Sequence, residues 1–158
     1  MIAIVDYGVG NLFSLSSSVK SLGAEVRVTR DAADLRAADH ILLPGVGAFA
    51  DAMAKLEATG LAPVLREETQ KKPLLGICLG MQLLFEESYE YGAHRGLGLI
   101  PGAVCPLADD LRDPALKVPH IGWNALDIVP GREADPLFKY IQNGEYVYYV
   151  HSLSLIHI

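Results

Sequence analysis

The order of short apolar runs and longer amphipathic stretches constrains the fold of this chain more than any other feature. Residues 2–5, 26–29, 41–43 and 74–77 have the composition of strands, and three of these four runs are almost wholly apolar. Parallel strands that are covered on both faces have this composition. Stretches with a helical pattern separate the runs. The alternation therefore predicts an α/β doubly wound sheet with helices on both faces.

The expected helices have recognisable ends. Asn11 can cap a helix that runs to about Leu22, and Gly23 suits the left-handed residue that ends it. Further helices are expected over residues 48–58, 61–70 and 79–87. After about residue 88, glycines and prolines separate short strand-like pieces. Residues 118–129 and 145–150 are strand candidates, so this half predicts antiparallel ribbons attached to the sheet.

Size and charge exclude several classes of protein. A chain of 158 residues suffices for one domain with a core of its own. Lys and Arg total 13 against 19 Asp and Glu, a net charge of −6, which argues against a nucleic-acid or anionic-membrane binder. No apolar run is long enough to span a bilayer. Two cysteines, Cys78 and Cys105, make no disulfide framework, so a reduced cytoplasmic protein is expected.

Residues 76–80 (Gly-Ile-Cys-Leu-Gly) carry the clearest chemical signal. They lie where an apolar strand turns into a helix, which is the arrangement of a nucleophile elbow with Cys78 as the nucleophile. Flanking glycines suit a strained turn in which side chains would clash. A helix N-terminus favours the thiolate, and the backbone N–H of Leu79 could stabilise an oxyanion. A lone cysteine is more often buried core, but the two glycines favour the elbow.

Two further motifs could belong to the same site as this elbow. Gln82 lies one helical turn after Cys78, so its amide could contact a substrate, although alone it would be a half-exposed surface residue. Residues 44–47 (Pro-Gly-Val-Gly) follow another strand, at the edge where open α/β sheets bind ligands. Their glycines let backbone N–H groups approach a ligand, or let a peptide plane rotate; the alternative is an ordinary loop.

Other kinds of site have weaker support. Gly8 and Gly10 after the first strand suggest a dinucleotide site with Asp31 as its acid, but Phe13 stands where that fingerprint needs Gly or Ala. The five histidines form no cluster with metal-ligand spacing, and Cys105 reads as structural. We therefore expect no metal and no cofactor.

Taken together, these motifs resemble a known family. Residues 76–86 look like the elbow of class I glutamine amidotransferases, whose sheet is flavodoxin-like. Residues 6–11, 44–47, 117–124 and 149–152 resemble the glutaminase subunits of imidazole glycerol phosphate synthase, an enzyme of histidine biosynthesis. The resemblance covers about residues 1–152. It implies a heterodimer with a (β/α)₈-barrel cyclase subunit, which receives ammonia released from glutamine and makes imidazole glycerol phosphate and aminoimidazole carboxamide ribotide.

The resemblance also implies roles for single residues. Cys78 would attack the glutamine amide and form a glutamyl thioester. Val46, Gly47 and Leu79 would form the oxyanion hole, with a peptide at Val46 and Gly47 that turns when the partner is liganded. The residues implied to hold the substrate are Gly47, Gln82, His151 and Ser152. Those implied to face the cyclase are Asn11, Lys117 and Trp123.

The end of the chain departs from the family. There the catalytic His and Glu come from a His-Pro-Glu tripeptide near the C-terminus, and the 158 residues contain none. Residues 1–152 are thus expected to be an incomplete, C-terminally truncated glutamine amidotransferase domain, and residues 153–158 a non-native tail. His157 lacks an acidic neighbour and is not expected to be the base. Glutaminase turnover by this chain is therefore expected to be negligible.

Three functional hypotheses follow from these observations. The chain is a glutaminase subunit, a non-catalytic fragment that docks on the cyclase, or another cysteine hydrolase of similar architecture. The matched motifs favour the first hypothesis, and the missing triad partners favour the second. The segment at residues 117–124 counts against the third.

Overall fold

A computed structural model of the chain describes the backbone of residues 1–113 and 115–157, and the side chains of residues 1–113 and 115–155. The chain divides into two compact units. The first comprises residues 1–105 with the C-terminal residues from 155 onward, and the second comprises residues 106–154. None of the described helices is both long and apolar enough to cross a membrane.

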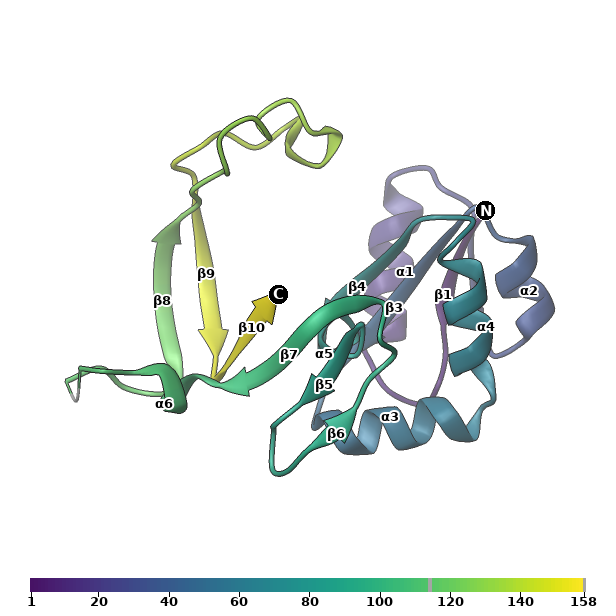
Figure 1. Cartoon of the computed structure of the whole chain (residues 1–158). Helices are drawn as coiled ribbons and strands as arrows, with labels where there is room; N and C mark the ends of the chain where they lie inside the picture. The colour runs from purple at the N-terminus through teal and green to yellow at the C-terminus, as the bar shows by residue number, and fades with distance from the viewer. Residues whose placement is uncertain (114, 158) are drawn as a thin grey trace. The chain divides into compact units, whose positions relative to one another are not determined.

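The first unit is built around a parallel sheet of four strands in the order β2-β1-β3-β4. Its elements up to the fifth helix are β1 (Ile2–Val5), α1 (Leu12–Ser21), β2 (Val26–Thr29), α2 (Ala32–Ala37), β3 (His40–Gly45), α3 (Phe49–Ala58), α4 (Leu61–Glu68), β4 (Leu74–Cys78) and α5 (Leu79–Gln82). The chain moves from β1 outward to β2 and then back across to β3 and β4. Right-handed crossovers therefore place α1 on one face and α2, α3 and α4 on the other. Figure 1 shows this arrangement, and α2 packs against α4.

Buried apolar residues lie on both faces of the sheet. Ile4 pairs in register with Leu42, so the neighbouring Ile41 points to the face opposite Ile4, and both are completely buried. Phe49 of α3 and Leu65 of α4 are also completely buried. On β4, by contrast, Leu75 and Ile77 are 53% and 36% exposed. The expectation that the apolar strands are covered on both faces is therefore wrong for β4 within the described residues, because Leu75 and Ile77 share one face of this strand and no described element covers that face.

A second sheet in the first unit has the order β10-β7-β5-β6. Its strands are β5 (Phe85–Ser88), β6 (His94–Arg95), β7 (Ile100–Pro106) and β10 (Leu153–His157). We expected antiparallel ribbons here, and β5 does pair antiparallel with β6. It pairs in parallel with β7, however, with Phe85 opposite Ile100. The residues between β5 and β7 are too few for a crossover helix, and the short β6 occupies this connection.

The second unit contains the antiparallel ribbon that the sequence predicted. β8 (His120–Ala125) pairs with β9 (Tyr146–His151), and Trp123 lies opposite Tyr148. A short helix, α6 (Leu107–Asp110), precedes β8, and a 3-10 turn (Pro136–Phe138) lies between the strands. Alternate residues of the ribbon point to opposite faces, so Ile121, Trp123 and Tyr148 share one face.

Candidate active site

Cys78 lies at the junction of β4 and α5. It is the last residue of the strand and the N-cap of the helix, with φ 55° and ψ −120°. A positive φ is unusual for a residue with a side chain, and one held there by its surroundings often marks a functional site. The thiol is exposed. The strained strand-to-helix turn predicted at Cys78 is therefore present, with the sulfur accessible to a reactant.

Three glycines let the chain make this turn. A Cβ on Gly76 would lie 2.5 Å from Cα of Met81, and a Cβ on Gly45 would lie 2.6 Å from the backbone N of Gly80. A Cβ on Gly80 would overlap the carbonyl oxygen of Leu43. α5 thus lies in backbone contact with β3 and β4. The requirement for glycine on both sides of Cys78 is confirmed, and its cause is this close packing.

The helix after Cys78 is shorter than predicted. A helix was expected over residues 79–87, but α5 ends at Gln82 and the chain re-enters a strand at Phe85. The apolar residues that suggested a longer helix, Leu83, Leu84 and Phe85, are buried in the core instead. Tertiary packing therefore overrides their preference for a helix. A helix of one turn has only a weak dipole. Gln82, half-buried, is its last residue, one turn beyond Cys78.

The loop at residues 45–48 lies beside Cys78. The register of β3 and β4 places Gly45 opposite Cys78, so the loop leaves the sheet at the level of the thiol. Val46 is 57% exposed. Gly47 has φ +99° and open space where its Cβ would be. Val46, Gly47, Leu79 and Cys78 are thus brought to one edge of the sheet. Backbone N–H groups beside a nucleophile are the kind of donor that stabilises a developing oxyanion in enzymes.

Two contacts that were not predicted from the sequence hold this loop in place. The Tyr7 hydroxyl donates to the carbonyl oxygen of Pro44 over 2.7 Å, and Tyr7 is only 3% exposed. Burial raises the pKa of Tyr7 to about 12, so the hydroxyl keeps its proton at neutral pH. The carboxylate of Glu90 accepts from the backbone N–H of Phe49 over 2.8 Å. The only sequence signal for the first contact is a tyrosine two residues after a buried strand.

The thiol of Cys78 has no polar partner among the described side chains: none is hydrogen-bonded to Cys78 or forms an ion pair with it. Cys105, the other cysteine, is half-buried on β7. The side chain of His157, the residue considered and rejected as a base, lies outside the described side chains.

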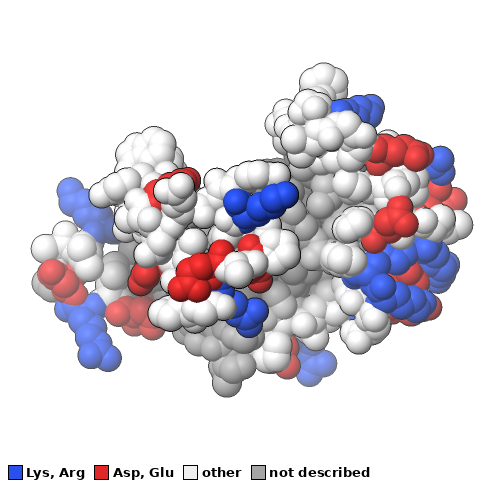
Figure 2. Space-filling view, turned by 90° about the horizontal axis from the view of Figure 1, so that it is seen from above, with Lys and Arg blue, Asp and Glu red and all other residues white. Residues whose placement is uncertain are grey.

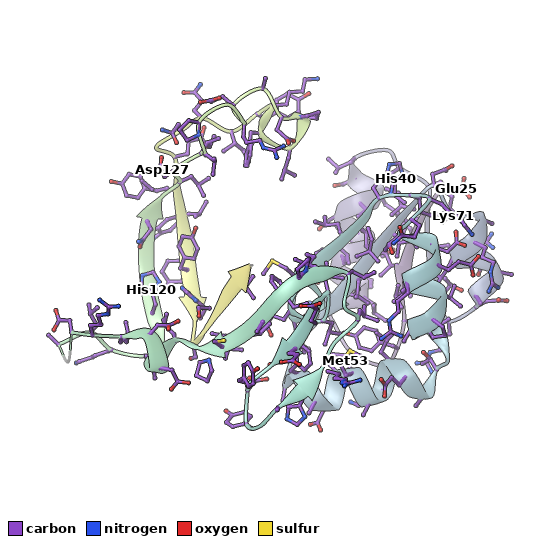
Figure 3. The ribbon with its side chains drawn as sticks, viewed as in Figure 1. Glu25, His40, Met53, Lys71, His120 and Asp127 are labelled. Carbon is purple, nitrogen blue, oxygen red and sulfur yellow. The ribbon has the colours of Figure 1, made fainter. Side chains whose placement is uncertain are left out.

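The remaining predicted substrate-binding residues belong to the second unit. His151 ends β9 opposite His120, which Figure 3 labels on β8. Its Nδ1–H donates to the carbonyl oxygen of Leu153 over 2.8 Å, and its Nε2 is hydrogen-bonded to Nδ1 of His120, 2.9 Å away. Ser152 is exposed, and its carbonyl oxygen accepts from the N–H of Leu107.

The residues expected to face a partner are accessible. Lys117 is exposed, and Trp123 is 66% exposed, with its ring 5.4 Å from that of Tyr148. Asn11 lies in the first unit. Its side-chain oxygen accepts from the N–H of Ser14 over 3.1 Å, which confirms the predicted helix cap.

The alternative sites gain no support. Asp31, the candidate ribose-binding acid, instead caps α2 by accepting from the N–H of Ala33. A Cβ on Gly10 would lie 3.0 Å from Cβ of Pro44, so the protein already fills that side of the loop. Within the described residues, no three His, Cys, Asp or Glu side chains are placed to hold a metal ion. Figure 2 shows acidic and basic side chains interspersed on the face it displays.

Comparisons with known proteins agree with this geometry. Residues 3–157 match the family described as glutamine amidotransferase class-I. The chain is 47% identical to imidazole glycerol phosphate synthase subunit HisH of Syntrophotalea carbinolica, over 99% of this chain and 76% of that protein. It is 45% identical to the subunit of the same name from Aquifex aeolicus, over 97% of this chain and 71% of that one.

A solved structure shares the fold. It is described as a crystal structure of glutamine amidotransferase and matches with a TM-score of 0.69 at 15% identity, over 98% of this chain and 74% of that one. At that identity the likeness shows the fold alone, whereas the identities above 40% to the HisH subunits show the family. The chain belongs to the class I glutamine amidotransferases and, within them, to the family of imidazole glycerol phosphate synthase subunit HisH.

Proposed function

We propose that this chain is the glutaminase subunit of an imidazole glycerol phosphate synthase, which releases ammonia from glutamine for histidine biosynthesis. The observation that carries the proposal is the strained turn at Cys78, because close packing at three glycines holds the residue at a positive φ with its thiol exposed. Membership of the HisH family supports this substrate and this pathway. A reducing cytoplasm, the compartment we propose, keeps such a thiol reactive.

The proposed reaction begins with attack on the glutamine amide. The thiolate of Cys78 bonds to the carbonyl carbon (Cδ) of the side-chain amide, and the carbonyl oxygen becomes an oxyanion, which the N–H of Leu79 and the loop at Val46 and Gly47 stabilise. The C–N bond then breaks, and the nitrogen leaves as ammonia after it gains a proton. Water hydrolyses the remaining thioester to glutamate and restores the thiol. Gly47, Gln82, His151 and Ser152 hold the substrate in this proposal.

The ammonia passes to a cyclase subunit of (β/α)₈-barrel form. Asn11, Lys117 and Trp123 are the residues that we propose for this heterodimer interface. An exposed indole supports the assignment, since aromatic anchors are enriched at the centres of protein interfaces.

The test is selective labelling of Cys78. A chloroketone analogue of glutamine should alkylate Cys78 well before Cys105, and millimolar glutamine should protect Cys78. Peptide mass spectrometry reads both sites in one sample, and Cys78→Ser should leave only the slow reaction at Cys105. Equal labelling of the two cysteines, or labelling that glutamine does not slow, would overturn the proposal.

A second candidate function is a cyclase-binding module that turns over no glutamine. It is favoured because no described side chain is hydrogen-bonded to Cys78. Loss of general acid–base assistance costs roughly 10²–10⁴-fold in rate. The two functions separate when ammonia release is compared between this chain and one extended through a His-Pro-Glu segment, each with a cyclase subunit. Glutamine turnover by this chain above background, and equal to that of the extended chain, would exclude the second function.

A further inference from the structure

The loop beside Cys78 is held at both ends and free in the middle. β3 carries the chain to Gly45, and α3 begins at Phe49, so residues 46–48 connect two fixed elements. Val46 is exposed, and the position of a Cβ on Gly47 is unobstructed. Any rotation of a peptide plane in this connection therefore meets least resistance between Val46 and Gly47.

Tyr7 fixes the first end. Its hydroxyl donates to the carbonyl oxygen of Pro44, which lies 37 positions further along the chain. A buried hydroxyl that lost this acceptor would have no water to replace it, so the contact is costly to break. A Cβ on Gly10, from the same loop as Tyr7, would lie only 3.0 Å from Cβ of Pro44, so this loop packs closely beside Pro44. The orientation of the Pro44–Gly45 peptide is thus determined by the loop that follows β1.

The second end is fixed from another direction. The backbone N–H of Phe49, the first residue of α3, donates to the carboxylate of Glu90. The N–H of Glu90 in turn donates to the hydroxyl of Ser88, a fully buried residue. Phe49 itself is completely buried. Because the end of the loop at Phe49 is held, the orientation of the loop's N–H groups depends on how firmly the other end, at Pro44, is held.

From these contacts we infer that Tyr7 is a positioning residue for the oxyanion hole. By holding the Pro44 carbonyl, it keeps the start of the loop stationary, so that the peptide between Val46 and Gly47 presents its N–H to the oxygen of a substrate bound at Cys78. The inference rests on the function proposed above. Tyr7 touches no reacting atom and acts only through the backbone at Pro44 and Gly45.

The experiment compares two reactions of the same thiol. In acylation by the γ-(4-nitrophenyl) ester of glutamate, the Cys78 thiolate adds to the γ-carbonyl, an oxyanion forms and collapses, and 4-nitrophenolate leaves. Alkylation by iodoacetamide displaces iodide directly and forms no oxyanion. The ratio of the two rates at Cys78 therefore measures stabilisation of the oxyanion separately from reactivity of the thiol. Both rates are measured near pH 9, where an ordinary thiol is largely ionised, with and without a cyclase subunit.

Tyr7→Phe keeps the ring and removes only the hydroxyl. We expect it to lower the ratio by about tenfold, less than the 10²–10³-fold loss caused by deleting an oxyanion donor outright. The matched control is Tyr89→Phe, which removes a hydroxyl that donates to Glu87 on the surface and should leave the ratio unchanged. If Tyr7→Phe does not fold by circular dichroism, Gly10→Ala, which pushes on Pro44 from the same loop, must lower the ratio instead.

The possible outcomes distinguish this inference from the proposed function. If Tyr7→Phe folds and the ratio of the acylation rate to the alkylation rate is unchanged, Tyr7 is not a positioning residue. The ratio is also unchanged when both rates fall by the same factor, and that result would mean that Tyr7 matters only for general structure. If the glutamate ester does not acylate Cys78 in the unaltered chain in preference to Cys105, the proposed function fails first, and with it the inference.

Discussion

At the scale of single residues, the site depends on glycines at positions where a side chain would not fit. Gly80 has no side chain, and the carbonyl oxygen of Leu43 occupies the space that a Cβ would need. The neighbouring atoms are backbone atoms of β3, which cannot move without disturbing its pairing with β1 and β4. The geometry at Cys78 is therefore built into the packing of α5 against the sheet, rather than into contacts of the cysteine itself.

Gly80→Ala should consequently be one of the most damaging small changes in this chain. Overpacking of this kind costs about 1–3 kcal/mol, and rigid backbone neighbours place it at the upper end. We expect a loss of about 3 kcal/mol in the free energy of unfolding, or roughly 6–12 °C in Tm. Gly122→Ala is the matched control, because its Cβ would enter open space. Thermal melts that shift equally for both variants would contradict this explanation.

At the scale of elements, Lys72 links the end of α4 to α2, because it pairs with the buried carboxylate of Glu68 and donates to backbone carbonyls of α2. Glu68, at the end of α4, is 3% exposed and lies 2.9 Å from Nζ of Lys72. Lys72 also donates to the carbonyl oxygens of Leu35 and Arg36, the latter over 2.7 Å, near the end of α2. Hydrogen bonds from Lys72 and Lys71 lower the pKa of Glu68. Figure 3 labels Lys71, which follows α4.

Glu68→Gln should destabilise the protein in a pH-dependent manner. Because the folded pKa of Glu68 is lowered, its contribution is present above the unfolded value of about 4.3 and is lost as the pH falls through the folded value. We therefore expect a lower Tm than wild type at pH 7, and a difference that shrinks below about pH 4. Glu67→Gln removes an exposed charge paired with Lys71 and should change little. A deficit of constant size from pH 7 to pH 3 would show that charge is not the cause.

The elements also show what sequence reasoning could and could not reach. β1, β2 and the Asn11 cap of α1 were predicted, because their signals lie within a few residues. α2 was missed, since six residues are too short to display helical periodicity. The turn at Cys78 was predicted from its glycines. The contact between Tyr7 and Pro44 was not, because it joins positions 37 residues apart and depends on how β1 and β3 pair.

At the scale of the whole molecule, the open question is which surface meets the proposed partner. The ribbon of the second unit carries Trp123 opposite Tyr148, and both are more than half exposed. Ile121 and Val150 lie on the same face and are similarly exposed. A contiguous exposed apolar face of this kind marks an interaction site more often than chance.

Trp123→Ala should therefore weaken binding to the cyclase subunit more than any other single truncation on this ribbon. Buried aromatic anchors at interfaces are worth at least about 2 kcal/mol, which corresponds to a loss of roughly 30-fold in affinity. In the unaltered chain, titration with the cyclase should shift the fluorescence of Trp123, the only tryptophan. Tyr140→Ala is the control, because Tyr140 is 85% exposed and lies outside β8 and β9. If Trp123→Ala binds as tightly as Tyr140→Ala while both remain folded, the ribbon face is not the docking surface, and Asn11 in the first unit becomes the next position to test.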